Sequence, residues 1–203
     1  GGFLFAMCSA TDSFDIALSF YNIDFAHSIY DGTPIDKTNI SNVDYSNGIA
    51  FENYELYTDP TIYEYSNIDY PSSHKPTTRT AESDYFTLSN FSAKWDPVPT
   101  MLIQNHISNV NGFMGQTTGY NKKFLKSHVL ILGEDLYSDQ VKYIHGNIGK
   151  GTFTFLGGHD PEDYRHFVGD PPTDLDLHRN SPGYRLILNN ILFPAAKKKP
   201  KKT

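Results

Sequence analysis

The sequence has very little cysteine, no long hydrophobic run and no excess of basic charge. Its 203 residues include one cysteine, Cys8, so no disulfide can form within the chain. No apolar stretch approaches the ~20 residues that a membrane-spanning helix needs, which excludes such a helix. The formal net charge is −6 at pH 7, and the one dense basic stretch is residues 197–203, with five lysines. We therefore expect a disordered Lys-rich tail there and no nucleic-acid partner.

The composition that is present fits one globular α/β domain. Hydrophobic residues make up 38% of the chain and aromatic residues 14%. Residues 3–7 are a short apolar run, typical of a buried strand in a parallel sheet. Residues 9–22 follow with helical spacing of their apolar positions, namely Phe14, Ala17, Leu18 and Tyr21. This order places Cys8 at a turn between a strand and a helix.

Five further elements are predicted downstream. Residues 127–133 (SHVLILG) read as a buried strand, and residues 100–104 as a short one. The apolar stretches 141–145 and 152–156 flank GNIGKG, whose glycines favour a β-hairpin. A helix is predicted over 181–193, because Ser181 and Pro182 form a typical helix start.

The predicted domain spans residues 1–196. Residues 31–100 are rich in Tyr, Asn, Asp, Ser, Thr and Pro, and we expect them to form an irregular, strand-containing insertion over the sheet edge. Aromatic residues within it could form a sugar- or peptide-binding surface, although a packed β insertion is the simpler interpretation.

Cys8 is the strongest candidate for a catalytic residue. The N-terminal end of a helix stabilises a thiolate, which is the nucleophilic form of cysteine. The small side chains of Ala6 and Ala10 suit the crowded backbone of a nucleophile turn. The alternative is a buried structural cysteine, a common role for an isolated thiol.

His159 provides the base that such a nucleophile requires. It follows a predicted strand and two glycines, in GGHDPE, and Asp160 or Glu162 could orient its ring. Nucleophilic catalysis needs a thiol, an imidazole within hydrogen-bond reach and an acceptor that fixes the imidazole. The backbone N–H of Ser9 would stabilise the oxyanion. Ser9 is therefore one predicted substrate-binding residue.

His106 and Gln116, which lie before and within the glycine-rich stretch NGFMGQTTGY, complete the predicted substrate-binding set. A packing or surface role for His106 is the alternative. GNIGKG lacks the spacing of a phosphate-binding loop, so no nucleotide cofactor is predicted. A group of His and Asp residues could indicate a metal site: His145, His159, His166, His178, Asp160, Asp163, Asp174 and Asp176. No HExxH motif or close histidine pair supports it, and no metal is predicted.

The order of Cys8, hairpin, His159 with Pro161-Glu162, and closing helix resembles the class I glutamine amidotransferase-like fold. GKGTFTFLGGH is similar to ThuA-like relatives of that fold, many of which lack the catalytic thiol. Across GGFLFAMCSATDSFDIAL, KWDPVPTML, GFMGQTT, GGHDPEDYRH and SPGYRLILNNILFPAAKKK, nearly the whole chain is similar to a bacterial family labelled asparagine synthetase B. The resemblance is to the C-terminal portion of that family and implies a flavodoxin-like, three-layer α/β sheet. It also implies that a preceding segment supplies the first strands of the sheet, so we expect the chain to be truncated at its N-terminus.

The resemblance also implies a function. We expect a glutamine amidotransferase-like hydrolase that acts on a small glutamine-like amide through Cys8, His159 and Glu162 or Asp160. It would work with a synthetase partner or as an oligomer, in the bacterial cytoplasm or periplasm. The alternative is a non-catalytic ligand-binding or envelope-associated module in which Cys8 is merely buried. A separation of about 3–4 Å between the Cys8 Sγ and the His159 imidazole favours catalysis, and more than about 8 Å favours the module.

Overall fold

The computed structural model describes residues 1–62, 64–69, 85–111, 113, 115–162 and 169–196. The predicted tail at 197–203 lies outside the described residues, as does the 70–84 part of the predicted insertion. None of the helices in the described part of the chain has both the length and the apolar character that crossing a bilayer requires.

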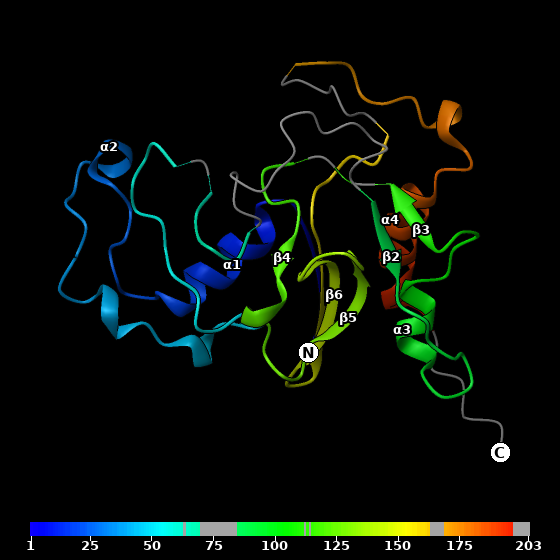
Figure 1. Ribbon diagram of the computed structural model, residues 1–203, viewed down its shortest axis with the longest axis horizontal. Coiled ribbons are helices and arrows are strands. Elements are labelled where there is room, and N and C mark those ends of the chain that lie inside the picture. Colours follow the sequence, from blue (N-terminus) through cyan, green and yellow to red (C-terminus); the bar gives the residue numbers. More distant parts are fainter. Residues whose placement is uncertain (63, 70–84, 112, 114, 163–168, 197–203) are drawn as a thin grey trace.

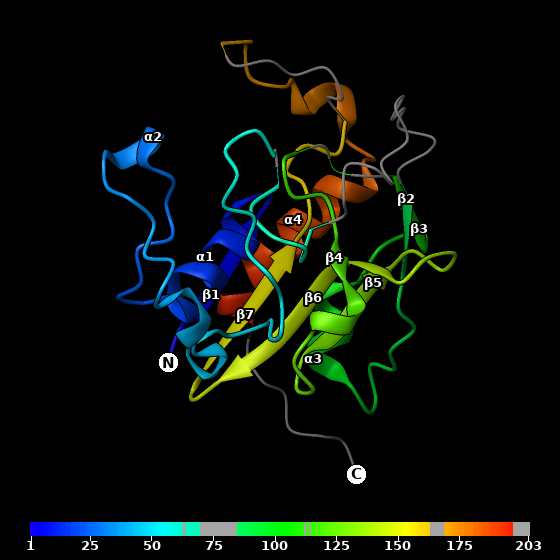
Figure 2. The same ribbon diagram turned by 60° about the vertical axis from the view of Figure 1, so that its left-hand side comes forward.

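The described strands form one curled, mixed sheet (Figure 2). In sheet order they are β1 (Phe3–Met7), β7 (Gly151–Leu156), β6 (Gln140–Ile148), β5 (Leu130–Glu134), β2 (Tyr85–Leu88) and β3 (Asn109–Asn111), and β4 (Tyr120–Asn121) pairs with β6. Only β1 and β7 are parallel, and the other strand pairs described are antiparallel.

Only two of the helices in the described residues are substantial, α1 (Ala10–Ser19) and α4 (Pro182–Leu192). The shorter helical segments are α2 (Ser28–Asp31), α3 (Pro97–Leu102), η1 (Ile40–Asn42), η2 (Tyr45–Asn47), η4 (Lys122–Phe124), η5 (Leu175–His178) and η6 (Phe193–Ala195). A flavodoxin-like sandwich needs several parallel strands with crossover helices on both faces. The predicted three-layer, amidotransferase-like fold is therefore wrong: the chain builds a half-barrel of mostly antiparallel strands.

The sheet has a hydrophobic cluster on each face, because successive strand residues point to opposite sides. On β1, Leu4 and Ala6 face the cluster that contains Ile16 of α1. Phe5 and Met7 face the second cluster. This second cluster contains Leu186 of α4, Leu102 of α3 and Phe86 of β2. Figure 1 shows α1 and α4 on either side of the central strands. Both long helices thus pack on the strand pair that carries Cys8 and His159 at its ends.

Several local predictions are confirmed. β1 and α1 flank Cys8, β5 lies within 127–133 apart from its last residue, and α4 starts after Ser181, whose Oγ accepts the Tyr184 N–H at 3.1 Å. β6 and β7 form the predicted hairpin, with Gly149 at φ 55° in its turn. The strand predicted at 100–104 is wrong, because Pro97 begins the short helix α3, where a missing N–H costs nothing.

Residues 40–69 contribute to the core on the α1 face. Ile49, Ala50 and Phe51 are buried there, and the Phe51 ring lies 5.2 Å from the Tyr120 ring. The Asp15 carboxylate accepts backbone N–H groups from these three residues at 2.9, 2.6 and 3.4 Å. The Asp15 side chain therefore attaches this irregular segment to α1, which packs on the sheet. The boundaries of the insertion, 31–100, stay a prediction.

Candidate functional site

Cys8 occupies a strained turn at the carboxyl end of β1. Its φ of 56° is left-handed, a conformation that few residues other than glycine adopt. Its backbone N–H donates to the carbonyl oxygens of Leu156 and Gly158, at 3.0 and 3.1 Å. Its own carbonyl accepts from the Thr11 N–H and the Thr11 hydroxyl, at 3.2 and 2.7 Å. The turn is thus fixed on one side by β7 and on the other by the first turn of α1.

The thiol is partly exposed and lies against the stretch 115–118. The Gln116 N–H donates to the Cys8 Sγ at 3.1 Å. Thr117 is held in turn, because its carbonyl accepts from the Gly158 N–H at 2.7 Å. A backbone donor aimed at the sulfur stabilises negative charge on it. The stretch therefore offers one fixed donor to a thiolate.

His159 reaches the same place from the end of β7. A Cβ placed on Gly115 would lie 2.6 Å from the Cys8 Sγ and 3.2 Å from the His159 Cδ2. The sulfur and this ring carbon are therefore no more than about 6 Å apart, compared with the ~3 Å of a direct hydrogen bond. His159 is exposed. The Cys8 Sγ and the His159 ring are therefore closer than the 8 Å that favours the non-catalytic module, although no hydrogen bond joins them in the described part of the chain.

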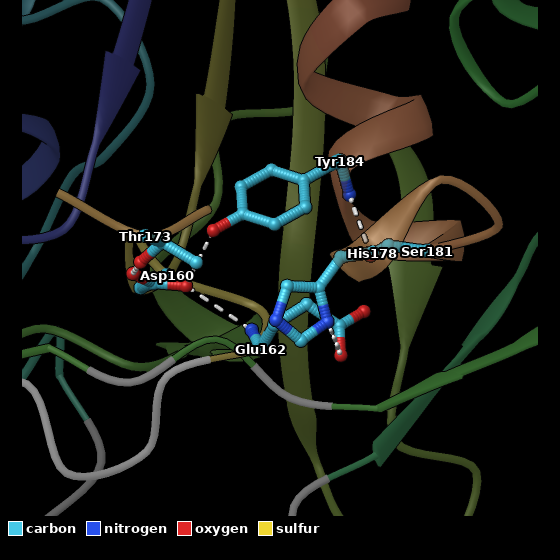
Figure 3. A network of polar contacts seen from close by, with 6 residues as sticks. All are labelled: Asp160, Glu162, Thr173, His178, Ser181 and Tyr184. Carbon is cyan, nitrogen blue, oxygen red and sulfur yellow. Dashed lines mark hydrogen bonds and ion pairs between the residues drawn. The ribbon is translucent and has the colours of Figure 1, made fainter. Parts of the chain in front are cut away.

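The carboxylate of Asp160 is the centre of a hydrogen-bond network (Figure 3). Its Oδ1 accepts from the Tyr184 hydroxyl at 2.9 Å and from the Glu162 N–H at 3.1 Å, and its Oδ2 accepts from the Thr173 hydroxyl at 3.2 Å. Burial raises the pKa of Tyr184 to about 12, and the hydrogen bond to Asp160 adds to the effect. Asp160 thereby anchors the loop after His159 to the start of α4.

Glu162 points from the same loop toward His178. Its Oε2 lies 3.5 Å from the His178 Nδ1 (Figure 3). The neighbouring Pro161 is buried against Gly183, so the loop seats on the first turn of α4. That either Glu162 or Asp160 orients His159 stays a prediction.

A buried acidic group lies behind the thiol. Asp12, one helical turn after Cys8, is fully buried, and its Oδ1 accepts from the Thr117 hydroxyl at 2.8 Å. Its Oδ2 has no hydrogen-bond partner within the described residues. Burial raises the pKa of Asp12 to about 7 against the lowering effect of Thr117, and the nearby Asp69 raises it further. Below about pH 7, Asp12 is therefore neutral.

Two of the three predicted substrate-binding residues, Ser9 and Gln116, lie beside the thiol, and His106 lies elsewhere. Ser9 follows Cys8, and no hydrogen bond from its N–H is found in the described part of the chain, so this donor is open to an oxyanion. The Gln116 backbone contacts the thiol, while its side-chain Oε1 accepts from the Tyr65 hydroxyl at 3.1 Å. His106 lines a separate cavity beside Arg185.

The histidines considered as metal ligands have other surroundings. His145 is buried, its Nδ1 lies 2.9 Å from the Thr154 Oγ1, and burial lowers its pKa to about 4. His166 and Asp163 lie outside the described residues. Among the residues that are described, no three His, Cys, Asp or Glu side chains gather in a way that could hold a metal ion.

The sequence patterns did not predict two features of the site, the positions of Gly115 and Asp12. Gly115 was visible only as one glycine of a loop, and its role depends on three segments that meet in space. Its place near the start of a predicted helix indicates an N-cap role for Asp12, whereas in the structure its carboxylate accepts a hydrogen bond from the Thr117 hydroxyl. The apolar spacing pointed to the wrong face of α1: Phe14 and Tyr21 are exposed, whereas the opposite face, with Asp12 and Asp15, is buried. The apolar spacing therefore carried no signal for the burial of Asp12.

Comparison with known proteins gives no match: no family model, curated protein or solved structure is similar to this chain. The predicted family membership therefore has no support beyond the motifs quoted above. The proposed function rests on the geometry of the site.

Proposed function

We propose that the chain is a cysteine-dependent hydrolase of a primary carboxamide of the glutamine type. The observation that carries the proposal is the shared approach of Cys8 and His159 to Gly115. A cysteine with positive φ at a strand-to-helix turn supports it, since backbone strain of this kind concentrates at functional sites. The partial exposure of Cys8 fits a thiol that meets a substrate better than a buried structural cysteine.

The chemistry follows from the groups at hand. The Cys8 thiol passes its proton to His159, and the resulting thiolate attacks the carboxamide carbon and forms a C–S bond. The N–H groups of Ser9 and Gln116 would donate to the oxyanion. The C–N bond then breaks, and ammonia leaves with the proton from His159. Water attacks the thioester carbon while His159 takes a proton from it. The C–S bond breaks, the carboxylic acid is released, and His159 returns the proton to the Cys8 sulfur.

Reaching this geometry requires the His159 ring to move closer to the sulfur than in the described state. Catalytic hydrogen bonds are commonly long before substrate binds and tighten in the complex. The exposed position of His159 leaves room for this movement. On this proposal the ammonia would be available to a synthetase partner.

Ammonia release from L-glutamine by the purified chain tests the proposal. We expect Cys8→Ala to abolish release, and His159→Asn to lower the rate by 10²-fold or more, because proton transfer contributes that much. His27→Asn is the matched control: the His27 Nδ1 accepts the Ile29 N–H at 3.2 Å, and asparagine caps a helix equally well. Release that is unchanged in Cys8→Ala would remove the thiol from the mechanism.

A second measurement tests the reactivity of the thiol without any substrate, so it applies whichever amide the protein hydrolyses. Cys8 is the only cysteine, so the rate of alkylation by iodoacetamide, followed by intact mass, reports on this thiol alone. We expect faster alkylation than that of free cysteine at pH 7, and at least tenfold slower alkylation in His159→Asn. No turnover of glutamine, together with alkylation slower than that of free cysteine, would contradict the proposal.

A further inference from the structure

A cavity of about 690 Å³ lies between the start of α4 and the turn that follows α3. Its lining includes the guanidinium groups of Arg179 and Arg185 and the imidazole of His106, and the other lining residues are neutral and polar. No acidic residue is among the described residues that line it. The chain as a whole has 23 acidic and 17 basic residues, whereas both charged residues that line this cavity are arginines. We call it the arginine cavity.

Hydrogen bonds hold the two walls of the arginine cavity together. The Asn105 Nδ2 donates to the Pro182 carbonyl at 2.7 Å, and the Asn189 Nδ2 donates to the Leu102 and Gln104 carbonyls at 3.1 and 2.8 Å. The turn after α3 is thus attached to α4 at two levels. A site whose walls are fixed in advance loses less entropy when a ligand binds.

The cationic groups are available to a ligand. Arg185 is exposed and makes no ion pair with a described residue. Arg179 donates to the Asp176 Oδ1 at 3.1 Å, but both side chains are mostly exposed, at 74% and 79%. Exposed ion pairs of this kind contribute little stability, so an anion can compete for Arg179. The positive end of the α4 dipole, at Ser181, adds to the attraction.

We propose that the arginine cavity binds a small polar molecule through an oxyanion group, either a carboxylate or a phosphate. The planar guanidinium presents paired donors that match both groups. The amides of Gln104 and Asn180 line the same space and suit a polar body beside the anion. The volume falls in the range of small-molecule sites, ~300–1,000 Å³. Neither Cys8 nor His159 lines this cavity, so the inference extends beyond the proposed function.

Isothermal titration of the full chain with inorganic phosphate and, separately, with glutarate at low ionic strength tests the inference, and the comparison shows which oxyanion is preferred. We expect saturable binding of at least one probe. Arg185→Gln and Arg179→Gln should each raise its Kd at least tenfold. Asp176→Asn should lower the Kd by a few fold, because it releases Arg179 from its ion pair.

Lys150→Gln is the matched control, since it removes one positive charge from an exposed hairpin position and should leave the Kd unchanged. Cys8→Ala should also leave it unchanged, which separates this inference from the proposed hydrolase. Failure of both probes to bind would overturn the inference. So would equal affinity in the wild-type protein and the Arg179→Gln/Arg185→Gln double variant.

Discussion

At the scale of single residues, the proposed chemistry depends most on Gly115, a position without a side chain. Gly115 lets Cys8 and His159 approach from two different strand ends, because a Cβ there would fall 2.6 Å from the sulfur and 3.0 Å from the Gly158 Cα. Gly158 is also required, since it has a φ of 77° and packs directly against Phe113. Two glycines thus create the space in which the reactive groups meet.

Replacing Gly115 with alanine should close that space. We expect Gly115→Ala to slow alkylation of Cys8 by iodoacetamide at least tenfold and to lower the free energy of unfolding by about 1–3 kcal/mol, as overpacking does. Urea denaturation and intact-mass kinetics provide the two measurements. Gly2→Ala is the control, because nothing lies within 4 Å of a Cβ placed there. Wild-type alkylation in Gly115→Ala would show that the glycine does not shape access to the thiol.

At the scale of secondary structure elements, α1 does more than cover the sheet. Its first turn fixes the Cys8 backbone through Thr11, and Asp15 in its second turn holds the backbone of 49–51. Burial raises the pKa of Asp15, while the N–H donors from Ala50, Ile49 and Phe51 lower it. The helix α1 therefore holds both the Cys8 backbone and the backbone of residues 49–51 in place (Figure 1).

Removing the Asp15 acceptor should loosen this segment without disturbing the thiol. We expect Asp15→Ala to lower the free energy of unfolding by about 2–4 kcal/mol, because three backbone donors lose a buried carboxylate. Amide hydrogen exchange should accelerate at 49–51, while the alkylation rate of Cys8 changes by less than twofold. Asp139→Ala serves as the control, because Asp139 is exposed and its carboxylate accepts no hydrogen bond from a described residue. Unchanged exchange at 49–51 would refute the assigned role of Asp15.

Apart from the strand predicted at 100–104, the elements that local patterns predicted were found, but their assembly was not predictable in the same way. Ser181 with Pro182, and the glycines of GNIGKG, indicate a helix start and a hairpin because the causes lie within a few residues. By contrast, β2 pairs with β5 and β3 across long stretches of chain, and no local pattern encodes strand order or direction. The parallel prediction was correct for the β1–β7 pair alone.

The same distinction applies to the candidate site. The position of Cys8 at a strand-to-helix turn followed from apolar spacing on either side of it. Its proximity to His159 depends on β1 and β7 being neighbours, and the donor from Gln116 depends on a third segment. The arginine cavity combines residues near 105 with others near 180, so the sequence offered His106 as a candidate without its partners.

At the scale of the whole molecule, buried titratable groups set how stability responds to pH. Burial raises the pKa of Asp12 from 3.8 to about 7, so the folded protein keeps a proton that the unfolded chain releases between these values. The contribution of Asp12 to stability is therefore most favourable below about pH 4, falls as pH rises to about 7 and stays low above that. Burial lowers the pKa of His145 to about 4, which gives the opposite slope over a similar range.

Comparing Asp12→Asn with the wild-type protein isolates one of these contributions. We expect the free energy of unfolding of the variant, minus that of the wild type, to rise by up to ~4 kcal/mol between pH 4 and pH 8. The asparagine oxygen can still accept from Thr117, so the loop beside the thiol should keep its position. Urea denaturation at several pH values provides the measurement. Parallel pH profiles for the two proteins would rule out a proton on buried Asp12 near neutral pH.

The parallel register of β1 and β7 has a mechanical consequence for the thiol. Met7 is the partner of Leu156 in that ladder, and the next N–H, from Cys8, continues it to Leu156 and Gly158. Sliding one strand past the other would break the whole row of backbone bonds, so Cys8 and the end of β7 that leads to His159 are held as one rigid unit. The 115–118 stretch is attached to this unit and to α1 by hydrogen bonds to Cys8, Gly158 and Asp12, so a shift of that stretch would change access to the thiol while leaving the strand pair intact.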